Sequence, residues 1–78
     1  MITSEQIRSA RAALDWSIEQ LASATAISSR TIMRMEAAAG VPSSTKANLQ
    51  AIKTALEAAG IEFIGTPDDR PGIRMNIK

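Results

Sequence analysis

The sequence predicts a mainly α-helical domain of four to five short helices that ends in a C-terminal β-hairpin. Serine or threonine residues flanked by apolar residues recur as helix starts in the first half of the chain. Apolar residues follow these starts at the three- and four-residue spacing of one helix face. After Gly60 apolar residues recur at every second position, which is typical of β-strands. We therefore expect a helical domain over residues 1–60 and a hairpin over residues 61–78.

The three predicted helix starts share one capping arrangement. Thr3, Ser17 and Ser28 are expected to be N-caps, because a side-chain hydroxyl can accept a hydrogen bond from a free N–H of the first turn. An apolar residue precedes each cap and another follows it by four residues, which is the spacing of a hydrophobic staple. The staple pairs are Ile2 with Ile7, Trp16 with Leu21, and Ile27 with Ile32. Gln6 and Gln20 complete capping boxes after the first two caps.

These caps divide the first forty residues into three helices. The first is expected at about residues 4–14, and the second opens at Ser17. A joint at residues 25–27 separates the second helix from a third at about residues 29–38. Trp16, the only tryptophan, is expected in the core as part of its staple rather than in a binding site.

A fourth helix and the hairpin complete the chain. The helix is expected at about residues 45–59, and Gly60 can end it by adopting a left-handed conformation. Strands are predicted at residues 61–64 and 73–77, joined by a loop rich in glycine, proline and aspartate. The second strand would present an apolar face of Ile73, Met75 and Ile77. An isolated hairpin is marginally stable in water, so this face either rests on the helices or forms a dimer interface.

The composition argues against several classes of protein. The 78 residues contain no cysteine and no histidine, so disulfides, thiolate metal sites and the commonest general base are missing. We expect neither an enzyme nor a protein with a metal or cofactor. No apolar run approaches the roughly 20 residues of a membrane span, and no signal-peptide pattern opens the chain, so a cytoplasmic protein is expected. An aromatic content of 3% disfavours RNA binding by base stacking.

The third helix carries the clearest functional pattern. The net charge is only +1, but the sole charged residues between Ser28 and Met35 are Arg30 and Arg34. At 100° per residue these arginines share an arc of about 140° with Met33, opposite the apolar side of the helix. Arginine can donate two hydrogen bonds to the major-groove edge of guanine. This pattern predicts a DNA-reading face, with candidate contacts at Ser28, Ser29, Arg30, Thr31, Met33 and Arg34.

Each of these residues also has a simpler interpretation. Ser28 is first of all a cap, to which a phosphate contact would be added at the helix N-terminus. Arg30 and Arg34 could be ordinary solvated charges, and Met33 an adaptable surface thioether instead of a contact to a thymine methyl group. Arg8 and Lys46 are either solvated or contact backbone phosphates.

Residues 7–36 resemble the phage repressor and Cro-like (Xre) helix-turn-helix family. The resemblance is carried by Leu21 and Ala22, the joint ending at Ile27, and then Ser28, Ile32 and Glu36. It covers about half of the chain, and most of the first sixty residues when the fourth helix is included. A repressor-like helix-turn-helix domain is the fold that this resemblance implies.

The family also implies roles for individual residues. Ser29, Arg30 and Arg34 correspond to positions that read bases, while Ser28 and Thr31 lie nearer the DNA backbone. Family members pair an arginine of the first helix with the glutamate that closes the third. The corresponding residues here are Arg11 and Glu36, so a structural ion pair is expected between them.

Two positions depart from the family pattern. Relatives often begin the second helix with glutamine, which bonds a phosphate or braces the recognition helix, whereas this chain has Ile18. Relatives often place glycine in the joint, where this chain has Ala26. In a left-handed conformation alanine costs roughly 1 kcal/mol relative to glycine.

The sequence therefore predicts a sequence-specific regulator of transcription that binds double-stranded DNA, more specifically a repressor acting as a homodimer. The hairpin is a candidate dimerisation element. The alternative is an antitoxin-type interaction module that binds a protein partner and also its own operator. Neither prediction involves a membrane.

Overall fold

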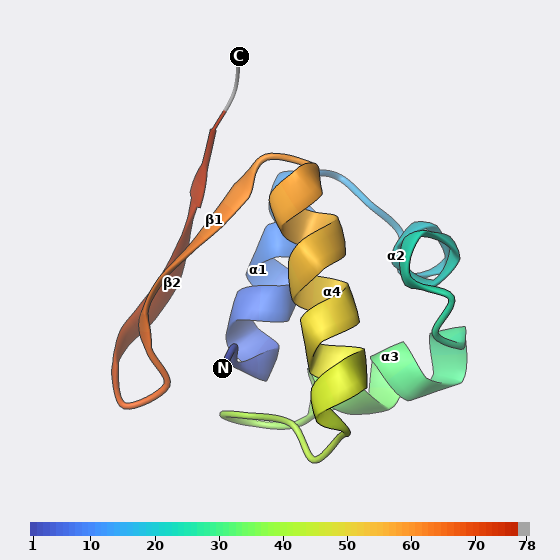
Figure 1. Cartoon of the computed structure of the whole chain (residues 1–78), viewed down its shortest axis with the longest axis horizontal. Helices are drawn as coiled ribbons and strands as arrows, with labels where there is room; N and C mark the ends of the chain where they lie inside the picture. Colours follow the sequence, from blue (N-terminus) through green and yellow to red (C-terminus); the bar gives the residue numbers. More distant parts are fainter. Residues whose placement is uncertain (77–78) are drawn as a thin grey trace.

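The computed structural model describes residues 1–76, which form four helices and a two-stranded sheet. The elements are α1 (Ser4–Ala13), α2 (Ile18–Thr25), α3 (Ser29–Ala37), α4 (Lys46–Ala58), β1 (Ile61–Thr66) and β2 (Asp69–Met75). Figure 1 shows α1 and α4 in the middle of the molecule, with the hairpin on one side and α2 and α3 on the other. The expected mainly α architecture with a C-terminal hairpin is confirmed. No helix within the described residues is long and apolar enough to span a membrane.

The predicted caps are present at the helix starts. The hydroxyl of Thr3 accepts a hydrogen bond from the backbone N–H of Gln6 at 3.1 Å, and Oε1 of Gln6 accepts one from the Thr3 backbone N–H at 2.8 Å. Ser17 and Gln20 form the same reciprocal pair. Because a capping box needs only residues three apart in the chain, it forms wherever the local sequence provides it.

The core joins all four helices and the first strand. Its buried side chains include both apolar members of the first staple and the inward residues of α4. The buried hydrophobic residues are Ile2, Ile7, Ala10, Leu21, Ile27, Ile32, Met35, Leu49, Ile52, Leu56 and Ile61. Leu14, Trp16 and Ile18 pack against this core from positions that are partly buried. The placement of Trp16 agrees with its predicted structural role.

The hairpin corrects one prediction. The loop expected over residues 65–72 is mostly strand, because β1 extends to Thr66 and β2 begins at Asp69. Gly65 adopts a φ of +75° at an irregularity in the pairing, where a Cβ would lie 2.2 Å from the carbonyl oxygen of Arg70. Glycine at a bulge and proline on an edge strand are both compatible with a sheet. Those residue types therefore did not mark a loop here.

One face of the hairpin rests on the helices of its own chain. The register places Ile61 opposite Met75 and Phe63 opposite Ile73. Phe63 and Ile73 pack against the core, whereas Met75 remains 38% exposed. Ile77, the third residue of the predicted apolar face, lies outside the described residues. Packing on the helices covers part of the apolar face and leaves its far end open.

A buried glutamine adds a polar link between α1 and the hairpin. Nε2 of Gln6 donates to the carbonyl oxygens of Ile64 at 3.1 Å and Gly72 at 2.8 Å. Oε1 of the same side chain accepts the capping bond from Thr3. Gln6 is only 4% exposed, so its amide would be costly to bury without these partners. One side chain thus caps α1 and holds both strands.

Candidate nucleic-acid interface

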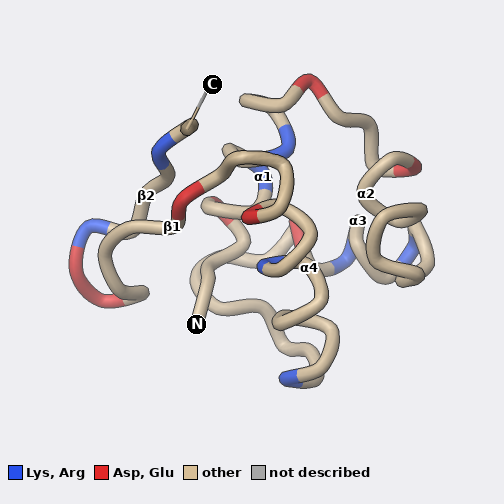
Figure 2. Tube along the Cα trace, turned by 45° about the horizontal axis from the view of Figure 1, so that its top comes forward, with Lys and Arg blue, Asp and Glu red and all other residues tan. Residues whose placement is uncertain are grey.

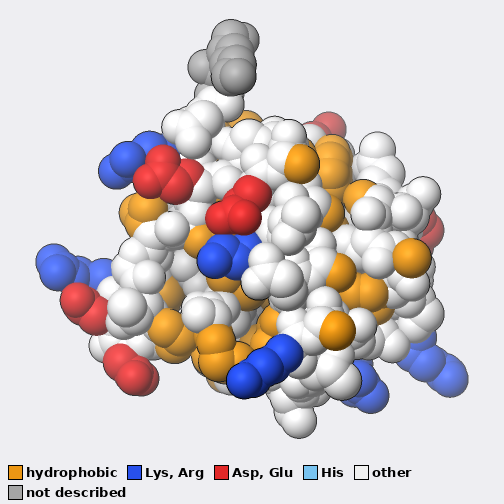
Figure 3. Space-filling model, in the orientation of Figure 1, with side chains coloured by type: hydrophobic (Ala, Val, Ile, Leu, Met, Phe, Trp, Pro, Cys, Tyr) orange, Lys and Arg blue, Asp and Glu red, His pale blue; other side chains and the backbone are white. Residues whose placement is uncertain are grey.

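The two sides of α3 differ sharply in exposure. Ile32 is fully buried and Met35 is 1% exposed, so this side of the helix belongs to the core. Arg30, Met33 and Arg34 lie on the solvent side, with Met33 52% exposed. In Figure 3, positively charged side chains project from the surface over α3, at the lower right. The residues that the sequence placed on one arc therefore share one accessible surface, which we call the α3 face (Arg30, Met33, Arg34).

The N-terminal turn of α3 is held by a local hydroxyl network. Oγ of Ser28 accepts from the backbone N–H of Thr31 at 3.2 Å, which makes Ser28 the N-cap. The Ser28 hydroxyl also donates to Oγ1 of Thr31 at 2.9 Å. Ser28 is exposed, while Ser29 and Thr31 are partly buried. The cap leaves Ser28 accessible beside the free N–H groups of the first turn, where an anion is favoured.

The joint before α3 requires a left-handed residue. Ala26 has φ +60° and ψ +22°, a conformation that crowds its Cβ. The hydroxyl of Thr25 supports the joint, because it donates to the carbonyl of Leu21 at 2.8 Å and accepts from the N–H of Ile27 at 3.3 Å. The joint therefore turns the chain into α3 despite the missing glycine.

The C-terminal end of α3 is held by an ion pair. The Arg11 guanidinium binds the Glu36 carboxylate through two hydrogen bonds of 2.9 Å each, and it donates a third to the carbonyl of Trp16 at 2.9 Å. The side chain of Glu36 is 6% exposed and that of Arg11 is 24% exposed. Hydrogen bonding to Glu36 raises the pKa of Arg11 above its usual value. Arg11 and Glu36 thus form the structural pair that the resemblance implied.

Two further side chains of α1 bind the same end of α3. Arg8, a candidate for phosphate contact, donates instead to the backbone carbonyls of Glu36 and Ala38. Oγ of Ser4 donates to the carbonyl of Met35 at 2.6 Å. Carbonyls at a helix C-terminus lack partners within the helix and carry partial negative charge, which suits both donors. The sequence analysis did not predict this role of Ser4. The pattern that could have indicated it is the spacing of residues 4, 8 and 11, which share one helix face.

The remaining candidates are dispersed. Lys46 is exposed at the first residue of α4. Ile18, the first residue of α2, packs against the core. The dimer candidates Ile73 and Met75 lie on the hairpin, whose charged tip is on the opposite side of the molecule from α3 (Figure 2). The structure therefore brings together the arginines of α3 but not Lys46 or the hairpin residues.

Neither a metal site nor similarity to known proteins assigns a function to this chain. Within residues 1–76, no group of three or more His, Cys, Asp or Glu side chains could hold a metal ion. No protein-family model matches the sequence, and no curated protein is similar to it. On the described surface, the α3 face combines two exposed arginines with the exposed thioether of Met33.

Proposed function

We propose that this protein is a sequence-specific regulator of transcription that binds double-stranded DNA, and that α2 and α3 act as a helix-turn-helix. The observation that carries the proposal is the exposure of Arg30, Met33 and Arg34 on a helix whose other side is buried. A reader of DNA needs a rigidly held helix with an accessible polar side. The ion pair of Arg11 with Glu36 supports the first requirement and the α3 face supports the second.

The major groove of B-DNA, about 12 Å wide, admits an α-helix. In that position Arg30 and Arg34 would donate to guanine edges, each good pair contributing roughly 1–3 kcal/mol of discrimination. The thioether of Met33 offers an apolar contact for a thymine methyl group. Ser28, at the helix N-terminus, would bind a phosphate that sets the position of α3 without reading sequence.

The proposed regulator is a homodimer that represses transcription by occluding the promoter. A single small module contacts few base pairs and buries a limited area, so two copies would bind a two-fold-related operator with half-sites about 34 Å apart. The exposed end of the hairpin at Met75 is the candidate contact between copies.

Selection of bound DNA from a random pool, at a stated salt concentration, tests this proposal. The parent protein should enrich one two-fold-related sequence. Arg30→Ala and Arg34→Ala should each relax the preference at their own base positions, because each removes one bidentate donor. Lys53→Ala is the matched control, since it removes an equal charge from α4, outside both the α3 face and the hairpin. The proposal fails if no sequence is enriched, or if both α3 variants select the parental sequence as tightly as the parent does.

A further inference from the structure

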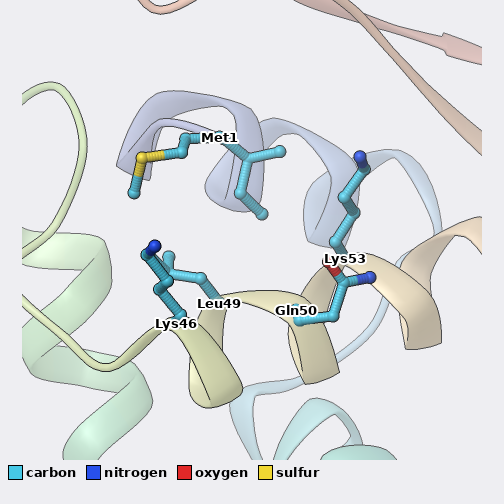
Figure 4. A pocket seen from close by; sticks show the side chains of 6 residues that line it. Met1, Lys46, Leu49, Gln50 and Lys53 are labelled. Carbon is cyan, nitrogen blue, oxygen red and sulfur yellow. The ribbon is translucent and has the colours of Figure 1, made fainter.

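A cavity of about 190 Å³ lies between the first residues of the chain and α4. Figure 4 shows the side chains of α4 on one side of this cavity and Met1 on the other. The lining residues are Met1, Ile2, Lys46, Leu49, Gln50 and Lys53. None of them belongs to the α3 face, so the cavity is a separate feature of the molecule.

The floor of the cavity is apolar. Ile2 is 3% exposed and Leu49 is 6% exposed, and both belong to the hydrophobic core. Met1, at 71% exposed, can move with little loss of packing. An engineered apolar cavity of about 150 Å³ is large enough to hold benzene. The space here therefore accommodates a short apolar chain or one ring.

Two lysine side chains lie at the two ends of this apolar floor. Lys46 and Lys53 are seven residues apart on α4, so they lie on nearly the same helix face and about 10 Å apart along its axis. Figure 4 shows their amino groups on opposite sides of Leu49. Neither lysine takes part in the ion pairs found within residues 1–76. Both positive charges are thus available to a ligand.

We propose that this cavity binds a small dicarboxylate with an apolar middle. Its carboxylates would pair with Lys46 and Lys53, and the apolar middle would cover Ile2 and Leu49. Suberate, an unbranched aliphatic dicarboxylate, is when extended nearly as long as the axial rise between Lys46 and Lys53 along α4. Ion pairs at an exposed surface contribute little on their own, so the affinity is expected to come from the apolar contact together with both charges. This proposal does not depend on DNA binding by α3.

The test is a titration of the isotopically labelled full chain with suberate, at constant ionic strength and without DNA. Saturable shifts are expected at the backbone amides of Ile2 and Leu49. Octanoate, which has one carboxylate and a similar chain, should bind about two- to fivefold more weakly. Succinate has the charge of suberate but cannot span the lysines, so it should produce no saturable shift there.

Charge-removing variants locate the two carboxylates. Lys46→Gln and Lys53→Gln should each weaken suberate binding by about two- to fivefold, because glutamine keeps the helix propensity of α4 but not the charge. Arg74→Gln removes the same charge from the hairpin and should leave the affinity unchanged. The proposal is overturned if suberate leaves Ile2 and Leu49 unperturbed or if succinate binds as tightly as suberate. Equal weakening by all three variants would also overturn it.

Discussion

The two ends of α3 are held in different ways. Ser4, Arg8 and Arg11 of α1 bind the C-terminal end, where Glu36 is buried. The N-terminal end depends on its own cap at Ser28, and Arg30 projects from it into solvent. Contacts distant in sequence orient α3 from its C-terminal end without covering its solvent side. Arg34, in the last turn, is therefore exposed as Arg30 is in the first.

Two adjacent residues of α3 provide the largest expected contrast. Ile32→Ala should lower the free energy of unfolding by about 3 kcal/mol, because it leaves a cavity in the core. Met33→Ala should change it by less than about 0.5 kcal/mol, since Met33 is half exposed. Urea denaturation of both variants measures the difference. Similar losses in the two variants would mean that α3 does not have the buried and exposed sides described above.

Removing the charge of Glu36 tests the anchor at the C-terminal end. Glu36→Gln should destabilise the fold by about 2–3 kcal/mol, because it leaves the partly buried Arg11 without its charged partner. The value is at the low end for buried pairs because Arg11 is partly solvated. Glu57→Gln, an exposed change on α4, is the control in the same denaturation experiment. A loss of less than 0.5 kcal/mol for Glu36→Gln would show that the ion pair does not stabilise the fold.

The joint before α3 should tolerate one stabilising change. Ala26→Gly should raise the free energy of unfolding by about 0.5–1 kcal/mol, because relief of the left-handed conformation exceeds the entropy cost of glycine. Ala24→Gly, inside α2, should instead lower it by roughly 1 kcal/mol. Thermal unfolding compares the two variants. If Ala26→Gly is as destabilising as Ala24→Gly, the joint is not strained.

The smallest effect is expected from Glu5, which contacts the segment after α3. Hydrogen bonds from its own backbone N–H and from that of Gly40 lower the pKa of Glu5 below the ordinary value of 4.5. A lowered pKa in the folded state stabilises the fold above the unfolded pKa, and this contribution is lost as the pH falls through the folded value. Between pH 6 and 3, the free energy of unfolding should therefore fall slightly less steeply with decreasing pH in Glu5→Gln than in the parent protein. A steeper loss in the variant would contradict this sign.

The loop between the strands shows where sequence patterns were insufficient. Gly65, Pro71 and Gly72 are typical of turns, yet Pro71 and Gly72 lie in β2. A bulge at Gly65 lets both strands continue toward a two-residue turn. Whether a glycine ends a strand or kinks it depends on the opposite strand, which local composition does not specify.

Local chemistry was enough to predict the helix starts, the burial of the apolar residues beside them and the side of α3 that carries Arg30 and Arg34. Caps and helix periodicity involve residues at most four positions apart, so the sequence alone determined them. Only the tertiary structure decided that Arg8 binds the carbonyls of α3 and that Gln6 holds both strands. Both contacts join residues more than twenty-five positions apart. Such partners depend on how the core packs, because the packing determines which free backbone groups lie within hydrogen-bonding distance of a side chain.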